Sequence, residues 1–247
     1  MDGHERPVPP GGAAPGFRTP GTITLARHGQ ASFLAADYDA LSEVGVRQAR
    51  LLGAALAASG PLPSRVVCGT MRRHRQTAEA SLAAMGLSPR WDVDAGWDEY
   101  DHLGIIRAFE PRFADPAALG AELARSDHPE EHFQRMFAGA VRRWASGAHD
   151  ADYEEPWPAF LSRVDDALRR LEPAAAGGVL VFTSGGPIAA ACRGLLGLSD
   201  AQALRHGWTL VNAGITRIEV GEGGLSLRGF NERDHFDGLD ADLLTYR

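Results

Sequence analysis

The sequence predicts an α/β fold of three layers, in which an open, mostly parallel sheet carries helices on both faces. Short apolar runs alternate with segments of helical periodicity along the chain, a pattern typical of repeated βα units. Connections between parallel strands cross over the faces of a sheet, so both faces become covered. The alternation stops between about 101 and 157, where the pattern is helical and predicts an insertion lying over the sheet edge.

The expected strands are short and apolar, and turn or capping residues mark the helices between them. Ser42 begins a helix that Gly60-Pro61 ends, residues 70–85 form a helix that stops at Gly86, and Gly185 opens a later one. Two final strands are joined by a glycine-rich turn. The strands expected in chain order are residues 22–26, 65–68, 179–182, 215–220 and 225–230.

The insertion and the helix after it each carry one apolar face. Their large side chains recur at spacings of three and four, which indicates core packing rather than a cofactor site. The residues on these faces are Phe133, Met136, Phe137, Ala140, Val141 and Trp144, then Phe160, Val164, Leu168 and Leu171.

Length and composition indicate one globular domain. The chain has 247 residues, of which 21–247 are expected to form that domain, with the insertion at about 101–157. Residues 1–20 contain five prolines and four glycines, a composition that predicts a flexible tail because it offers little apolar area to bury.

The charge balance and apolar runs exclude several classes of partner. Lysine and arginine number 25 against 32 aspartates and glutamates, and the net charge of −7 opposes nucleic-acid binding. No apolar run reaches the roughly 18 residues of a membrane span, and the charged amino terminus is unlike a signal peptide. We therefore expect a cytoplasmic protein, with Cys68 and Cys192 as buried free thiols.

Polar residues follow two of the expected strands at the point where each ends. Arg27-His28-Gly29-Gln30 follows the first strand, and a helix rich in arginine, including Arg73, opens after the second. In open α/β sheets, ligands bind beyond the carboxyl ends of the strands. Arginines together with the amides of a helix start favour an anion as the ligand.

These segments together resemble the histidine phosphatase superfamily, the phosphoglycerate-mutase-like proteins, whose hallmark is Arg-His-Gly at the end of the first strand. The resemblance spans roughly residues 21–247, and its matching blocks keep the family's order. Besides Arg27-His28-Gly29, the blocks are Leu41 to Ala49, Arg73 to Ala78, Asn212 and Asn231 to His235.

The resemblance implies a phosphomonoester hydrolase acting on a small phosphorylated metabolite. His28 would be the nucleophile that forms a phosphohistidine, and Arg27 and Arg73 would hold the phosphate. Planar guanidinium groups suit this task because they donate to phosphate oxygens in pairs. By the family's spacing Glu99 is the acid that protonates the leaving alcohol, flanked by Trp97 and Tyr100; Asp98 and Asp101 are the fallback candidates.

The sequence departs from the family at the later strand, where Ser184 stands in the place of a second catalytic histidine. A hydroxyl still donates one hydrogen bond, and Gly185 still opens a helix, so both remain expected phosphate contacts. Loss of one preorganised donor typically costs about 2.7 to 4 kcal/mol of transition-state stabilisation. A phosphoester-binding or regulatory protein with weak or no catalysis, and a mutase or specialised biosynthetic enzyme, remain alternatives.

The rest of the substrate is expected to contact Gln30, Ser32, Tyr100 and His102, under a helical insertion that shapes the pocket over the active site. Arg107 and Arg112 either bind a second anionic group or are solvated. No cofactor and no metal are expected. The sequence His128-Pro129-Glu130-Glu131-His132 matches an inverted zinc-protease pattern, but Pro129 pushes His128 out of helical geometry and indicates a helix start instead. A homodimer is compatible with the sequence.

Overall fold

The computed structural model describes residues 20–32 and 39–246. The expected tail over residues 1–20 therefore lies, apart from Pro20, outside the described residues. Within them six strands form one sheet in the order β3-β2-β4-β1-β5-β6. Strands β1 to β4 pair in parallel, whereas β5 runs antiparallel to both β1 and β6. The strands are β1 (Gly21–Arg27), β2 (Arg65–Cys68), β3 (Asp92–Val93), β4 (Val179–Thr183), β5 (Ile215–Gly221) and β6 (Gly224–Glu232).

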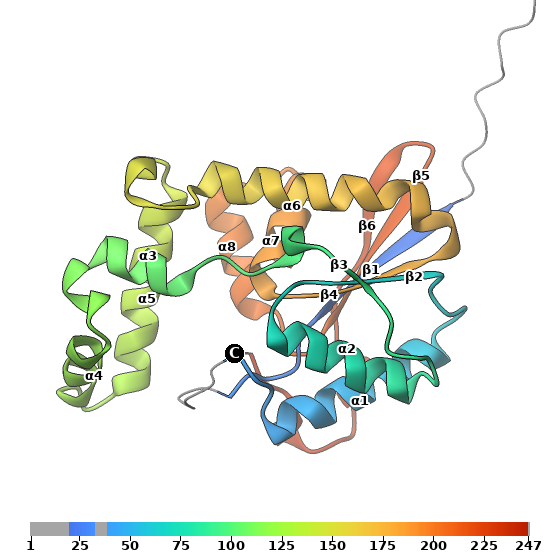
Figure 1. Cartoon of the computed structure of the whole chain (residues 1–247), viewed down its shortest axis with the longest axis horizontal. Coiled ribbons are helices and arrows are strands. Elements are labelled where there is room, and N and C mark those ends of the chain that lie inside the picture. Colours follow the sequence, from blue (N-terminus) through green and yellow to red (C-terminus); the bar gives the residue numbers. More distant parts are fainter. Residues whose placement is uncertain (1–19, 33–38, 247) are drawn as a thin grey trace, which may run out of the picture.

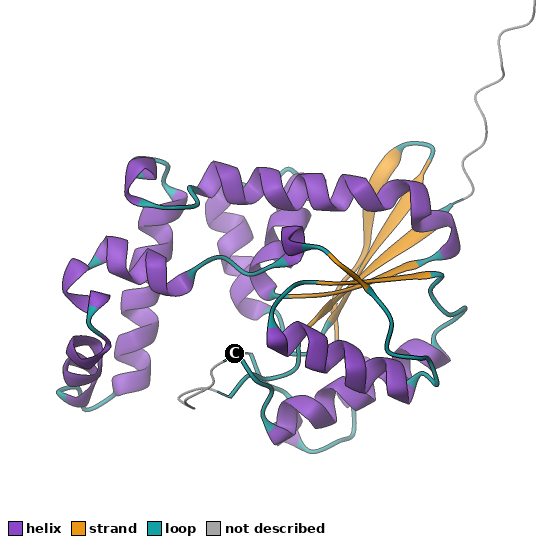
Figure 2. Ribbon diagram, viewed as in Figure 1, coloured by secondary structure: helices purple, strands orange, loops and turns teal. Residues whose placement is uncertain are grey.

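Helices cover both faces of this sheet, which confirms the predicted α/β architecture (Figure 1). Helices α1 and α2 lie on one side of the strands, and α6, α7 and α8 lie on the other, as the colouring by element type in Figure 2 shows. Their bounds are α1 (Glu43–Ala58), α2 (Arg72–Ala84), α6 (Trp157–Leu171), α7 (Gly185–Leu196) and α8 (Asp200–Thr209).

Strand β4 shows why the sheet needs cover on both faces. Val179 and Val181 belong to the core cluster that contains the inner faces of α6 and α7. Leu180 and Phe182 belong to the other cluster, which contains the inner faces of α1 and α2. Successive side chains of a strand point to opposite faces, so a continuous apolar run requires a helical layer on each.

Helices α3, α4 and α5 lie within the expected insertion and gather at one side of the molecule, apart from α1 and α2 (Figure 1). Trp144 of α5 contacts Trp157 and Phe160 of α6, with ring centroids 4.8 and 5.4 Å away. Of the apolar face predicted for this segment, Phe137, Ala140, Val141 and Trp144 join the main core, whereas Phe133 and Met136 are half-buried outside it. The bounds are α3 (His102–Phe109), α4 (Pro116–Ala124) and α5 (Pro129–Ala145).

Short 3-10 turns complete the described chain: η1 (Ala95–Trp97), η2 (Pro111–Ala114), η3 (Asp150–Asp152), η4 (Glu172–Gly177), η5 (Asp234–Phe236) and η6 (Ala241–Leu243). The capping predictions are confirmed, because the Ser42 hydroxyl accepts from the Gly45 amide at 3.0 Å and Pro129 opens α5. Cys68 and Cys192 are buried free thiols, as expected. No helix in the described ranges is long and apolar enough to cross a membrane.

Gly29 brings the end of β1 against the start of α1. A Cβ atom at Gly29 would lie 2.3 Å from the carbonyl oxygen of Gly45, and one at Gly45 would lie 2.1 Å from that of Gln30. Both distances are far below van der Waals contact, so only glycine fits at either position without moving backbone. The glycine of the Arg-His-Gly block therefore sets how closely helix α1 approaches the loop after β1.

Candidate active site

Two neighbouring strand ends bring the candidate nucleophile next to the start of a helix. Arg27 of β1 pairs with Thr183 of β4, and the amide of His28 donates to the Thr183 carbonyl at 2.9 Å. Ser184 and Gly185, which begin α7, therefore lie beside His28. The amides of a helix start point outward and attract anions, so this edge of the sheet favours a negatively charged group.

The His28 side chain is held as a neutral imidazole. The residue is only 5% exposed, and its ring Nδ1 lies 2.7 Å from the Gly29 carbonyl oxygen, which can only accept. Nδ1 must therefore carry the proton, and Nε2 keeps its lone pair. Burial lowers the pKa of His28 well below its usual value, and the nearby positive charges of Arg73 and Arg27 lower it further.

Two guanidinium groups lie around this imidazole. Arg27 donates from Nη1 to the carbonyl oxygens of Leu210 and Tyr246, and its Nε would lie 3.6 Å from a Cβ atom at Gly185. Arg73 is 5% exposed and donates to the Asp39 carboxylate at 2.8 Å. Within the described part of the chain its buried Nε has no hydrogen-bond partner. Burial of a cation with an unused donor is costly, and an anionic ligand would remove that cost.

Glu99 lies in the segment that follows β3 and η1, and its carboxylate contacts the start of α7. Its Oε2 accepts from the Gly186 amide at 3.1 Å and its Oε1 accepts from the Tyr100 amide at 3.3 Å. Burial raises the pKa of Glu99, although the Gly186 hydrogen bond and the charges of Arg73 and Arg27 oppose the rise. A carboxyl group with a raised pKa, close to both arginines, is suited to donate a proton within this site.

The two fallback carboxylates have other partners. Asp98 accepts from the Thr70 amide at 2.6 Å and from its hydroxyl at 2.5 Å, which ties the Glu99 segment to the end of β2. Asp101 caps α3 by accepting from the Gly104 amide at 3.0 Å and is exposed. Among the three carboxylates considered, Glu99 is therefore the one whose hydrogen bonds join it to the start of α7.

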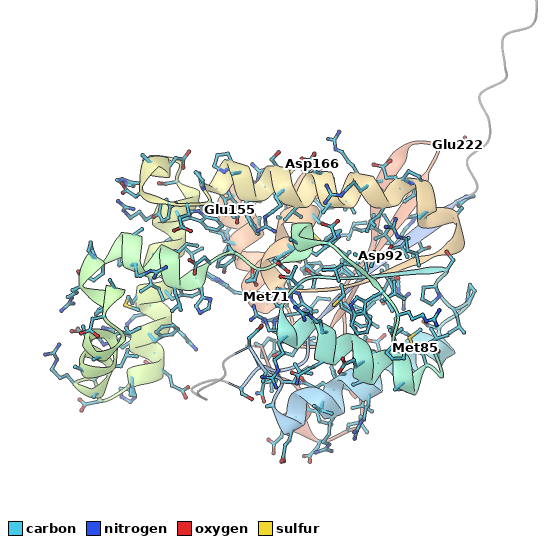
Figure 3. The ribbon with its side chains drawn as sticks, viewed as in Figure 1. Met71, Met85, Asp92, Glu155, Asp166 and Glu222 are labelled. Atoms are coloured by element: carbon cyan, nitrogen blue, oxygen red, sulfur yellow. The ribbon has the colours of Figure 1, made fainter. Side chains whose placement is uncertain are left out.

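Arg163 of α6 holds the segment that carries Glu99. Its Nη1 donates to the carbonyl oxygens of Ala95, Gly96 and Asp98 at 3.0, 3.1 and 3.0 Å. Glu155, labelled in Figure 3 near the start of α6, accepts from Arg163 Nε and Nη2 at 2.6 and 2.9 Å. Three carbonyl acceptors on one guanidinium nitrogen fix the course of a segment that has little regular structure of its own.

His74, which the sequence analysis did not include in the site, lies against Ser184. His74 follows Arg73 in the first turn of α2, which begins beyond Met71 in Figure 3. Its Nε2 lies 2.6 Å from the Ser184 Oγ, and both residues are fully buried. The His74 and His28 ring centroids are 5.8 Å apart. The signal in the sequence was a histidine beside Arg73 on the inward face of a helix.

Three amide or hydroxyl side chains from the family blocks support the loop after β1. Gln48 accepts from the Gln30 amide at 2.7 Å, Thr77 accepts from the Gly29 amide at 3.1 Å, and Asn212 donates to the His28 carbonyl at 3.2 Å. Each satisfies a backbone group of the segment that presents His28. These contacts hold the backbone of the candidate nucleophile in place and were not predicted from the sequence.

The four residues expected to contact the rest of the substrate lie in different surroundings. Gln30 accepts from the Ser42 hydroxyl at 2.7 Å, and Ser32 donates its amide to the Ala40 carbonyl at 2.8 Å, so both belong to the loop after β1. Tyr100 packs on Trp144, with ring centroids 5.0 Å apart. His102 is half-buried at the start of α3; burial, followed by the charge of Arg73, lowers its pKa.

The arginines left open by the sequence analysis form ion pairs on the surface. Arg107 lies 3.4 Å from Asp101, and Arg112 lies 3.3 Å from Glu122. Exposed pairs of this kind contribute little stability, and they are compatible with the solvated alternative. Across the described ranges, no group of three or more His, Cys, Asp or Glu side chains is arranged to hold a metal ion.

Comparison with known proteins relates the whole arrangement to one family. The model of the histidine phosphatase superfamily (branch 1) matches residues 23–110 and 121–233. No curated protein sequence shows significant similarity to the chain.

Solved structures share the fold at low sequence identity. A phosphoglycerate mutase from Bacillus anthracis is 20% identical, with a TM-score of 0.60 over 88% of this chain and 95% of that one. A phosphoserine phosphatase from Entamoeba histolytica, solved with phosphoserine, is 17% identical, with a TM-score of 0.60 over 87% and 98%. A mycobacterial glucosyl-3-phosphoglycerate phosphatase is 22% identical, with a TM-score of 0.57 over 87% and 100%.

Proposed function

The chain belongs to the histidine phosphatase superfamily, and we propose that within it the protein is a phosphomonoester hydrolase acting on a small phosphorylated metabolite. The substrate's phosphate lies between the Arg27 and Arg73 guanidinium groups, with further hydrogen bonds from the Ser184 hydroxyl and the amide of Gly185. Each close contact between unit charges is worth about 4 kcal/mol at an effective dielectric near 20, before desolvation.

The first chemical step transfers the phosphoryl group to His28. The lone pair on Nε2 forms a bond to phosphorus while the bond from phosphorus to the ester oxygen breaks, and Glu99 gives its proton to the departing alkoxide. The hydrogen bond from Nδ1 to the Gly29 carbonyl, 2.7 Å long, stabilises the positive charge that develops on the imidazole. The products of this step are an alcohol and a phosphohistidine.

The second step returns the enzyme to its starting state. Glu99, now a carboxylate, takes a proton from a water molecule whose oxygen attacks phosphorus. The bond between phosphorus and Nε2 breaks, and inorganic phosphate leaves. Glu99 therefore serves as acid and then as base, which suits a carboxyl group whose pKa is raised by burial.

The observation that carries this proposal is the convergence of Arg27, His28, Arg73 and Glu99. They come from three separate parts of the chain. Even so, the charges of Arg73 and Arg27 add to burial in lowering the pKa of His28, and the same two charges oppose the rise that burial causes in the pKa of Glu99. A nucleophile held neutral, two cations around it and an acid with a raised pKa are the groups that phosphomonoester hydrolysis requires.

A steady-state assay with p-nitrophenyl phosphate and a panel of metabolite phosphomonoesters tests the proposal. We expect the native protein to release inorganic phosphate and His28→Ala to lose that activity. His149→Leu, at an exposed position, is the control and should match the native protein. No hydrolysis by the native protein, combined with micromolar binding of phosphoesters, would favour the phosphoester-binding alternative.

A further inference from the structure

The hydrogen bond between His74 and Ser184 is the feature of the pocket that the two chemical steps above do not use. It joins the first turn of α2 to the first residue before α7, and its atoms lie 2.6 Å apart between two side chains that are fully buried. Within the described part of the chain, the Ser184 hydroxyl has His74 as its hydrogen-bond partner. A buried polar pair costs free energy of folding unless all of its hydrogen-bonding groups are satisfied. A pair of this kind in a pocket therefore calls for a functional explanation.

The backbone around this pair leaves room for the imidazole. A Cβ atom at Gly69 would lie 2.3 Å from His74 Nδ1 and 2.6 Å from the nearer Asp98 carboxylate oxygen. The absence of a side chain at residue 69 thus lets the His74 ring lie between Asp98 and Ser184. His74 Nδ1 is 3.8 Å from that same carboxylate oxygen, which is beyond hydrogen-bond distance, and among the described residues it has no hydrogen-bond partner. The hydrogen bond that the ring makes is therefore the one through Nε2.

A phosphate bound beside His28 determines which way the protons of this pair point. An ionised phosphate oxygen only accepts hydrogen bonds, so the Ser184 hydroxyl contributes to binding only when its proton points at the phosphate. The Ser184 oxygen must then accept from His74, which requires the proton of the imidazole on Nε2. With the proton on Nδ1 alone, His74 would accept the Ser184 proton and withdraw it from the ligand.

We propose that His74 is a positioning residue that donates from Nε2 to Ser184 and thereby directs the Ser184 hydroxyl proton at the transferring phosphoryl group. This inference rests on the proposed function, because it assigns the donor that acts on the same phosphate. The imidazole reaches the pocket wall from α2, whereas the residue at the start of α7 supplies only a hydroxyl. Removal of either partner removes the same directed donor, so the two losses are not independent.

Four variants separate this role from simple packing. His74→Leu and Ser184→Ala each remove the directed donor, and the double variant removes both partners. His74→Gln keeps an amide N–H at about the reach of Nε2 and serves as the conservative replacement. His149→Leu, exposed in the loop before η3, is the matched histidine control. Thermal unfolding of each variant shows that the folded protein is being assayed.

We expect kcat/KM for p-nitrophenyl phosphate to fall about 100-fold in His74→Leu and about 100-fold in Ser184→Ala, the usual effect of losing one preorganised donor. The double variant should fall no further than the worse single variant, and His74→Gln should stay within about tenfold of the native protein. Native kcat/KM in folded His74→Leu, multiplying losses in the double variant, or equal losses in folded His74→Gln and His74→Leu would each overturn the proposal.

A binding measurement distinguishes this inference from the proposed function. Calorimetric titration with inorganic phosphate reports the directed donor without any turnover. If the native protein hydrolyses nothing but binds inorganic phosphate, the proposed function fails, while weaker binding in His74→Leu that His74→Gln restores still supports the pair. Equal phosphate affinity in native protein, His74→Leu and Ser184→Ala overturns the inference whatever the activity.

Discussion

The imidazole rings of His28 and His74 lie with their centroids 5.8 Å apart and their planes 36° from parallel. His28 begins the loop after β1, and His74 lies in the first turn of α2. Burial lowers the pKa of both rings well below 6.5, and Arg73 lowers both further. The two rings are therefore neutral together near pH 7. This relationship ties the stability of the protein to pH.

The sign of that dependence follows from proton binding. Below pH 6.5 the unfolded chain takes up protons on these histidines, whereas the folded protein does not until the pH reaches its much lower pKa values. The contribution of these two neutral histidines to the free energy of unfolding is fully present above pH 6.5 and is lost as the pH falls below it. Each histidine contributes a slope of up to about 1.36 kcal/mol per pH unit.

We expect chemical denaturation at pH 7, 6 and 5 to show a steeper loss of unfolding free energy in the native protein than in His74→Gln. The difference between the two slopes of unfolding free energy against pH should approach the value for one proton, because the variant lacks one buried neutral imidazole. Glu99, whose pKa is raised, acts in the opposite direction but is common to both proteins. Identical slopes would contradict the burial of His74 as a neutral ring.

Glu99→Gln should separate substrates by their leaving groups. The amide cannot protonate an alkoxide, so phosphate esters of aliphatic alcohols should lose about 100-fold or more in kcat, the usual contribution of a general acid. The nitrophenolate ion leaves without protonation, so formation of the phosphohistidine from p-nitrophenyl phosphate should change much less, as a pre-steady-state burst would show. An equal decrease in the rate of phosphohistidine formation for both kinds of ester would argue against Glu99 as the acid.

Gly29→Ala tests the packing of α1 against the loop after β1. A Cβ atom there would lie 2.3 Å from the Gly45 carbonyl oxygen, so backbone must move. We expect a loss of unfolding free energy of about 1–3 kcal/mol, the usual range for overpacking. Gly120→Ala in α4 is the matched control: nothing lies within 4 Å of its Cβ position, and we expect a gain of about 0.5–1 kcal/mol. Equal stability of the two variants would refute the close approach.

Arg163→Ala should release the segment that carries Glu99. Three carbonyl oxygens and the Glu155 carboxylate lose their donor, and we expect kcat to fall about tenfold or more because misplacing a catalytic group by about 1 Å can cost 100-fold. Arg169→Ala on the same helix is the control. Arg169 is exposed, and within the described ranges its ion pair is with Asp165 one turn away, so kinetic constants should be unchanged. A matching, negligible effect of both substitutions would remove Arg163 from the support of the site.

The sequence was sufficient to predict five of the six described strands and the covering helices α1, α2, α6 and α7, because apolar periodicity and capping residues are local signals. Helix α8 was not predicted. Strand β3 was not located, since it has only two residues and both are exposed. The hydrogen bond between His74 and Ser184 was also not predicted, nor were the hydrogen bonds from Arg163 to the segment that carries Glu99. Their partners lie 110 and 65–68 residues away, so only the fold, which sets α2 beside β4 and packs α6 against η1, brings them together.

The choice among adjacent carboxylates was the other point that residues alone left open. Asp98 and Glu99 are neighbours in sequence, but successive side chains of an extended segment point in opposite directions. Asp98 consequently reaches back to Thr70 at the end of β2, while Glu99 reaches forward to Gly186 at the start of α7.

The most direct test of the account is to look for the phosphorylated nucleophile itself. The native protein is mixed briefly with a labelled phosphomonoester, stopped with alkali to preserve a phosphoramidate, digested, and analysed by mass spectrometry. We predict acid-labile phosphate on the peptide that contains His28, at a level that falls as the substrate is exhausted and is absent in His28→Ala. Turnover of the same substrate with no phosphate on His28 at any time, or with undiminished labelling in His28→Ala, would contradict the account.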